Sequence, residues 1–169
     1  KAIKTVVSLL KPPKKQTVSQ WAEEKRKIKQ GTSAYPGDWN NNLTPYLVEV
    51  MDAYNDLDIR EIIFVKPSQI GGTSAMENII GFIVDNEPAS SMVVFPVEQI
   101  LKYFSEEKLQ SMIDSTPTLK NKYYKGKSKL KEKRFAGMTL FFANARALND
   151  TASRSIKNLF LDEIDKMTH

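Results

Sequence analysis

Short apolar runs alternate with longer helical patterns from residue 60 onward. Each run has the length and the β-branched or aromatic content of a strand. Strands are expected in four runs, at residues 61–65, 90–95, 138–143 and 156–161. Helical patterns follow the first run at 73–86 and the second at 97–115. Because strands that alternate with crossover helices form parallel sheets, the pattern predicts an α/β fold. Strand 61–65 is expected to be buried on both faces.

The first 58 residues have a different pattern. Thr17 and Ser19 stand ahead of acids, as at a capped helix start, and this helix should fade near Gly31. A turn-rich loop follows to residue 42, and Thr44-Pro45 then begins a helix that reaches about residue 54. The sequence therefore predicts a helical extension over residues 1–58 and an α/β core over 59–169, with a short helical piece at 146–153 before the last strand.

Composition narrows the function classes. The chain has 169 residues, 41% of them hydrophobic, which suits one folded domain. It has no cysteine and one histidine, so disulfides, a thiol nucleophile and a zinc site are not expected. No apolar stretch approaches the length of a membrane span, and no membrane partner is expected.

Basic residues outnumber acidic ones, 25 to 20, and many of them crowd residues 120–134. Tyr123, Tyr124 and Phe135 lie among these lysines. Such a segment can neutralise nucleic-acid phosphates and pack on sugar or base. A solvated hairpin that binds nothing is an equally good interpretation of the sequence.

A phosphate loop is indicated where the first run meets the helix at 73–86. Residues 66–73 read Lys-Pro-Ser-Gln-Ile-Gly-Gly-Thr, close to G-x-x-x-x-G-K-[ST]. Gly72 stands where the usual lysine would be, and Lys66 stands in the first-glycine slot. Backbone N–H groups of such a turn and the following helix start can hold an anion. We expect Lys66 to reach the β- and γ-phosphates, and Thr73 to place its hydroxyl on Mg²⁺. An ordinary turn between strand and helix is the alternative.

An acid pair follows the last apolar run. Asp162 comes 89 positions after Thr73 (162 − 73), directly behind residues 156–161, and Glu163 and Asp165 follow it. Acids at the carboxyl end of a strand lie where open α/β sheets bind ligands. Asp162 is expected to handle Mg²⁺ and Glu163 to orient or deprotonate water. A helix cap or a solvated turn would explain the same acids. Loop and acid pair together predict a nucleotide hydrolase.

With these motifs the chain resembles the ATPase region of the large terminase subunit of tailed phages, in particular the lambda-type packaging ATPases. The resemblance covers about residues 19–165. The matching segments are Pro36-Gly37-Asp38-Trp39, Pro45-Tyr46, the loop 66–73, Val94-Phe95-Pro96, Phe135-Ala136-Gly137 and residues 154–165. Members commonly read Gln-x-Gly-Lys-Thr in the loop, and in some the basic residue stands at the loop's beginning, as Lys66 does here.

The resemblance implies a P-loop NTPase fold of the RecA/ASCE type, a parallel sheet flanked by helices, which uses ATP and Mg²⁺. It assigns nucleotide binding to the whole loop, Ser68, Gln69 and Gly71 included, and adenine contact to the stretch with Trp39, Pro45 and Tyr46. Alternatively, both aromatic side chains anchor the core. Arg154 matches an arginine that would sense or stabilise the γ-phosphate.

By the same resemblance, the intact protein would drive double-stranded DNA into a capsid in the host cytoplasm. Its partners would be a small terminase subunit, the portal and further copies of itself in a ring. Full-length members carry a C-terminal nuclease domain, so the sequence is expected to be a truncated or degenerate form. Two rivals stay open: a helicase-like ATPase, since residues 162–165 read Asp-Glu-Ile-Asp, and a non-catalytic DNA- or partner-binding relic.

Overall fold

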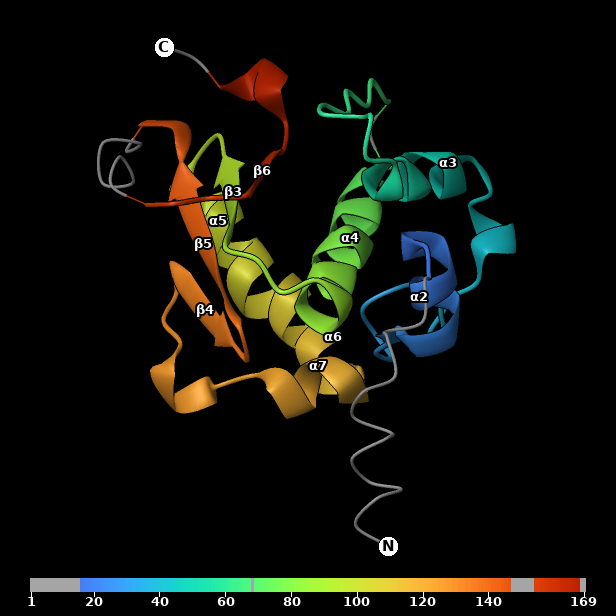
Figure 1. Cartoon of the computed structure of the whole chain (residues 1–169), viewed down its shortest axis with the longest axis horizontal. Coiled ribbons are helices and arrows are strands. Elements are labelled where there is room, and N and C mark those ends of the chain that lie inside the picture. The colour runs from blue at the N-terminus through green and yellow to red at the C-terminus, as the bar shows by residue number, and fades with distance from the viewer. Residues whose placement is uncertain (1–15, 68, 147–153, 168–169) are drawn as a thin grey trace, which may run out of the picture.

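The computed structural model describes residues 16–67, 69–146 and 154–167. The helices are α2 (Val18–Lys25), α3 (Tyr46–Asp52), α4 (Gly72–Asn86), α5 (Glu98–Tyr103), α6 (Gln110–Ser115) and α7 (Pro117–Lys122). The strands are β1 (Lys27–Ile28), β2 (Gly37–Asp38), β3 (Ser91–Phe95), β4 (Glu132–Phe135), β5 (Met138–Asn144) and β6 (Asn158–Leu161). Figure 1 shows their arrangement.

The main sheet has four strands in the order β4-β5-β3-β6. Strand β3 pairs in parallel with both β5 and β6, whereas β4 is antiparallel to β5. The α/β class is confirmed, and strands appear at three of the four expected runs. Strand β4 was not foreseen. It pairs with β5 through the turn at Ala136-Gly137, where Gly137 has φ +84°, which an L side chain rarely adopts.

The expected strand at residues 61–65 is wrong. These residues form no helix or strand, and Ile63 and Val65 are 76% and 90% exposed. Only Phe64 packs against the core. Among the described residues, no strand lies beyond β6, so this run has no hydrogen-bonding partner in the sheet. A single extended segment without a ladder is not stable as a strand, whatever its side chains.

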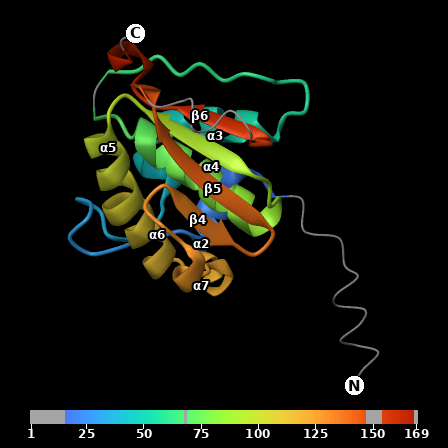
Figure 2. The same cartoon turned by 90° about the vertical axis from the view of Figure 1, so that its left-hand side faces the viewer.

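Helices α4, α5 and α6 lie against one face of the sheet (Figure 2). Alternate residues of the strands point into that face, including Val93, Phe95, Leu140 and Phe142, and the Phe95 and Phe104 rings lie 5.0 Å apart. On the other face Met92, Val94 and Ala143 form a smaller cluster. All five residues of β3 are buried, as expected for a central strand of a parallel sheet.

The N-terminal helices pack against α4. Thr17 and Gln20 form a capping box at the start of α2. The Trp21 ring lies in the space that a Cβ on Gly81 of α4 would need, and its Nε1 donates a hydrogen bond of 2.9 Å to Asp85. The described part of the predicted helical extension, from residue 16 onward, therefore shares one hydrophobic core with α4.

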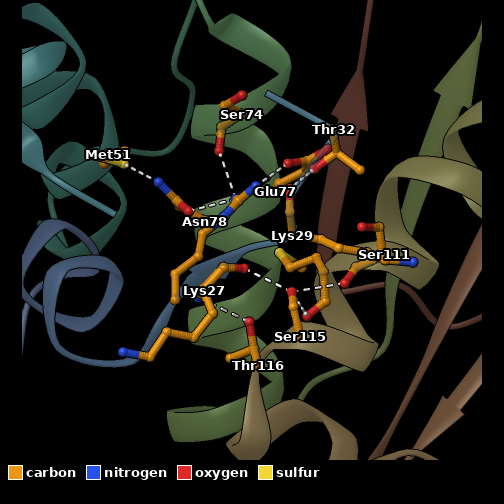
Figure 3. Close-up of polar contacts among 12 residues, drawn as sticks. Lys27, Lys29, Thr32, Met51, Ser74, Glu77, Asn78, Ser111, Ser115 and Thr116 are labelled. Atoms are coloured by element: carbon orange, nitrogen blue, oxygen red, sulfur yellow. Dashed lines mark hydrogen bonds and ion pairs between the residues drawn. The ribbon is translucent and has the colours of Figure 1, made fainter. Parts of the chain in front are cut away.

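A buried polar network ties this layer to α4 and α6. Arg26, 6% exposed, forms an ion pair with Glu77 and a 2.6 Å hydrogen bond to Asn78. Asn78 in turn lies 3.2 Å from the Met51 sulfur, and Ser115 Oγ donates to the Lys27 carbonyl (Figure 3). Because unpaired polar groups are costly inside a protein, these bonds fix how α2 and β1 sit against α4.

Helix α5, a π-helical turn over Phe104–Leu109, and α6 together span the expected helix at 97–115. Within the described part of the chain, no helix has both the length and the apolar character that crossing a membrane requires.

Candidate functional site

The loop before α4 has the geometry of an anion-binding turn. Gly71 adopts a left-handed conformation, with φ +83°, and α4 begins at the next residue. A helix start presents unpaired N–H groups and a partial positive charge. The first turn of α4 holds no acidic residue. The N-terminus of α4 is therefore suited to bind a phosphate.

The Lys66 side chain lies across the first residue of α4. Its Cδ and Cε occupy the volume that a Cβ on Gly72 would need, and its Nζ lies 3.2 Å from that position. Any side chain at Gly72 would displace Lys66. The loop has Gly72 where the usual lysine stands and Lys66 at its beginning, and the structure gives a steric reason for this arrangement. The Lys66 side chain occupies space that is open only because Gly72 has no side chain.

Asp162 meets this loop from the sheet. Its backbone N–H donates to the Val94 carbonyl at 3.1 Å, which continues the β6–β3 ladder. The Thr73 hydroxyl donates to Asp162 Oδ2 at 3.3 Å. The two motifs that lie far apart in the sequence therefore meet at the carboxyl end of the sheet.

Two opposing effects act on the pKa of Asp162. Burial raises this pKa above its ordinary value, and the nearby charge of Glu163 adds to the rise. The positive charge of Lys66 and the Thr73 hydrogen bond act in the opposite direction. The net direction is upward, and a cation bound nearby would favour the ionised carboxylate.

Backbone strain concentrates at this site. Among the described residues, Gln69 and Glu163 are the two non-glycine residues with positive φ, 63° and 55°. Such conformations cost about 1–3 kcal/mol each and cluster at functional sites. Glu163 Oε2 lies 3.1 Å from Lys166 Nζ. This strain could not be predicted from the residue types, because Gln and Glu have no special preference for positive φ.

The two aromatic side chains expected at the adenine differ in position. The Tyr46 hydroxyl donates to the Ile70 carbonyl at 3.1 Å, and its ring is 50% exposed beside the loop. Trp39 is 7% exposed, donates from Nε1 to Asn41 and lies under the Arg26 guanidinium, 5.3 Å from it. The structure thus brings Tyr46 to the loop and places Trp39 in the core.

The remaining site residues are placed as follows. Arg154 lies over the Phe141 ring, 4.1 Å from its centroid, on the sheet side of the molecule. Gly71 is at the helix start, and Gln69 is exposed in the loop. Ser68 and most of the helical piece expected at 146–153 lie outside the described residues.

In the part of the chain that the structure describes, no three His, Cys, Asp or Glu side chains gather as metal ligands. Mg²⁺ commonly takes only one or two protein oxygens, because phosphates and waters complete its octahedron. Thr73 and Asp162 supply two oxygens 3.3 Å apart, and the site fits that ion.

The structure defines a mixed α/β protein in which a glycine turn enters a helix beside a carboxylate at the end of a parallel strand, an arrangement in which proteins of this class can bind phosphate. The comparison with family models is consistent with this class and narrows it. The model of the phage terminase large subunit gpA, ATPase domain, matches residues 33–169. The chain belongs to this family, and the resemblance seen in the sequence is confirmed. The search of curated proteins and the search of solved structures gave no match.

Proposed function

We propose that this domain binds and hydrolyses ATP at the site between the 66–73 loop and Asp162, and that hydrolysis drives double-stranded DNA into a capsid. Membership of the terminase ATPase family supports ATP use. The observation that carries the assignment of the site is the 3.3 Å contact between Thr73 and Asp162, with Lys66 alongside. A phosphate loop and a magnesium-handling acid must meet in this way to act on one nucleotide.

ATP supplies the phosphoanhydride bond, and Mg²⁺ would neutralise part of the negative charge on the phosphates. The helix start at Gly71 and Gly72 holds phosphate oxygens, and Lys66 adds a cation over them. Thr73 and Asp162 supply the protein oxygens for Mg²⁺. The fold proposed for this site is of the P-loop, RecA/ASCE type, with the loop and the acid pair as its Walker A and Walker B motifs.

Glu163 is proposed to orient and deprotonate the attacking water. It follows Asp162 directly, and its left-handed backbone sets its side chain apart from the extended strand that precedes it. Its Oε2 lies 3.1 Å from Lys166 Nζ. Binding of nucleotide would have to release or bypass that contact.

Other assignments rest on the resemblance together with the geometry. Tyr46, exposed next to the loop, is proposed to contact adenine by stacking on a purine face. Trp39 keeps its predicted role only if it moves, because it is buried, whereas Arg154, which lies over Phe141, is proposed to sense or stabilise the γ-phosphate. A homo-oligomeric ring, the small subunit and the portal are proposed as partners, in the host cytoplasm.

The test compares Glu163→Gln with Asp165→Asn, a matched loss of one nearby exposed acid. Glu163→Gln is expected to bind ATP normally and to lower turnover by about 10²–10⁴-fold, the usual contribution of a general base. Asp165→Asn should retain both. Calorimetric titration of ATP and a phosphate-release assay measure the two quantities.

Equal turnover in Glu163→Gln and the unsubstituted chain would remove Glu163 from the mechanism. An unsubstituted chain that binds no ATP would refute the proposed site and favour a non-catalytic module.

A further inference from the structure

A surface rich in lysine lies at the end of the molecule away from the candidate nucleotide site. It is formed by α7 and the segment that leads into β4, which lie at the opposite end of α4 from the phosphate loop (Figure 1). We call Lys120, Lys125, Lys127 and Lys129 the basic surface. Lys122, in the same segment, contacts Asp85 at the last turn of α4. Since α4 has 15 residues, about 20 Å of helix separates this surface from the phosphate loop.

Charge in this segment is one-sided. Between residues 116 and 131 every charged residue is a lysine, and none is acidic. Ordinary solvated surfaces mix charges of both signs. An uninterrupted run of one sign creates a local potential that attracts an oppositely charged partner.

The segment is held in place by buried side chains. Leu119 is fully buried, and the Tyr123 ring packs on Phe135 at 5.4 Å and donates from its hydroxyl to Gln110. Leu130 packs against the core. The lysines stand between these anchors and face outward.

Hydrogen bonds brace the turn that carries the lysines. The Tyr124 N–H donates to the Arg134 carbonyl at 2.9 Å, Ser128 Oγ donates to the Tyr124 carbonyl, and the Arg134 N–H donates to Ser128 Oγ. The hairpin is therefore ordered before any ligand binds, unlike a solvated linker. Preorganisation lowers the entropy lost on binding.

The four lysines of the basic surface are exposed, and none forms an ion pair with another residue that the structure describes. The other lysines of this segment are paired or buried. Lys122 pairs with Asp85, Lys131 pairs with Glu98, and Lys133 is buried, which lowers its pKa, while Glu106 and Asp114 oppose that shift. The fold thus neutralises or buries the other three lysines of this segment and leaves these four available.

An aromatic ring completes the surface. Tyr124 is 47% exposed, and Lys127 Nζ lies 5.5 Å from its ring centroid. Tyr hydroxyls and lysine ammonium groups both contact phosphate and sugar in complexes with DNA. The combination suits a sugar–phosphate backbone better than an isolated anion.

We propose that the basic surface binds the phosphate backbone of double-stranded DNA, without sequence preference and apart from the nucleotide site. The choice of duplex DNA as the polyanion rests on the proposed packaging function; the surface itself rests on the lysines and their geometry. The distance along α4 predicts that ATP and DNA bind without competing for side chains.

The test removes three of the charges and measures how DNA affinity depends on salt. The variant is Lys125→Gln, Lys127→Gln and Lys129→Gln together. The matched control is Lys29→Gln, Lys102→Gln and Lys157→Gln, which removes three exposed lysines elsewhere. Fluorescence anisotropy with a labelled duplex, at 50–200 mM salt and without nucleotide, gives log K against log[salt].

The slope is expected to become shallower by about 2.7 in the variant, at about 0.9 per lost phosphate contact, and affinity to fall at least about tenfold. The control should keep the slope of the unsubstituted chain. The corresponding triple Lys→Arg variant should also keep it, and circular dichroism should show the same fold for all four proteins.

An unchanged slope in the Lys→Gln variant, or an equal loss in the control, would overturn the proposal. So would an unsubstituted chain that binds poly-glutamate but not duplex DNA. Because no nucleotide is present, the outcome is independent of ATP hydrolysis. The proposal that the basic surface binds DNA is unaffected if Glu163→Gln retains turnover, and the DNA-binding test can refute it without affecting the ATPase assignment.

Discussion

Two apolar runs of equal length have different structures in this molecule. Residues 61–65 read Glu-Ile-Ile-Phe-Val, and Ser91–Phe95 read Ser-Met-Val-Val-Phe. Every residue of the second run is buried at the centre of the sheet, whereas most of the first is exposed and outside any strand. Side-chain character therefore does not explain the difference.

The difference lies in the neighbours. Strand β3 has a parallel partner on each side, so its backbone N–H and C=O groups are paired and its side chains are covered on both faces. The run at 61–65 has no ladder among the described residues. An apolar, β-branched run can form a strand, but it does so only where adjacent strands are present to pair with it.

This contrast extends to the candidate site, because one half of the site follows the exposed run and the other half is hydrogen-bonded to β3. Asp162 comes directly after β6, which β3 anchors through the hydrogen bond to Val94. Lys66 comes directly after the exposed run. The acid half is thus fixed by the sheet, and the lysine half is positioned by its own packing over Gly72.

The largest expected effect separates the two runs by stability. Phe95→Ala should lower the free energy of unfolding by about 3–5 kcal/mol, because it leaves a cavity beside Phe104. Val65→Ala should change it by less than about 0.5 kcal/mol, since Val65 is 90% exposed. Urea unfolding measures both. Equal losses in the two variants would show that residues 61–65 are packed in solution as β3 is.

A smaller effect is expected where the exposed run enters the loop. Gly72→Ala should weaken ATP binding by about tenfold, because the new Cβ would displace Lys66 from its place over the helix start. Gly126→Ala is the control, since a Cβ there would meet nothing within 4 Å. Calorimetric titration gives the two affinities. Unchanged affinity in Gly72→Ala would mean that Lys66 does not need this position to bind phosphate.

The smallest expected effect concerns Asp162, the half of the site that follows β6, and it depends on pH. Burial raises the pKa of Asp162 above its value in the unfolded chain, so its ionisation costs stability; this cost builds as pH rises above the ordinary value of 3.8 and is complete once pH exceeds the raised pKa. Asp162→Asn should therefore raise the Tm of the nucleotide-free protein at pH 8, and the gain should shrink to nothing below the ordinary value of 3.8. Thermal melts at several pH values test this, with Asp165→Asn as an exposed control. A gain in Tm that does not vary with pH would show that ionisation of Asp162 is not its cause.

Local patterns were sufficient for much of the fold. The predicted helix at 73–86 corresponds to α4, the predicted strand at 90–95 to β3, and the predicted helix at 97–115 to α5, the π-helical turn and α6, because each pattern has a strong period and clear end signals. Strand β4 was missed, because lysines and charged residues dominate Glu132–Phe135 and hide its pairing with β5.

The candidate site was predictable as a meeting of two motifs, and the Thr73–Asp162 contact agrees with that prediction. Its finer features were not predictable. The strained backbone at Gln69 and Glu163 has no signal in the residue types, and the choice between adenine contact and a core position for Trp39, which lies buried under Arg26, was left open by the sequence.

The sequence by itself determined the α/β class, the terminase family and the residue types that a phosphate and a metal ion require, because these depend on local period, spacing and side-chain chemistry. Tertiary structure alone decided which apolar run became a strand, how Lys66 lies across Gly72 and which lysines stay unpaired. The physical reason is that hydrogen-bond ladders, steric exclusion and charge pairing need partners distant in the chain, and local patterns do not specify those partners.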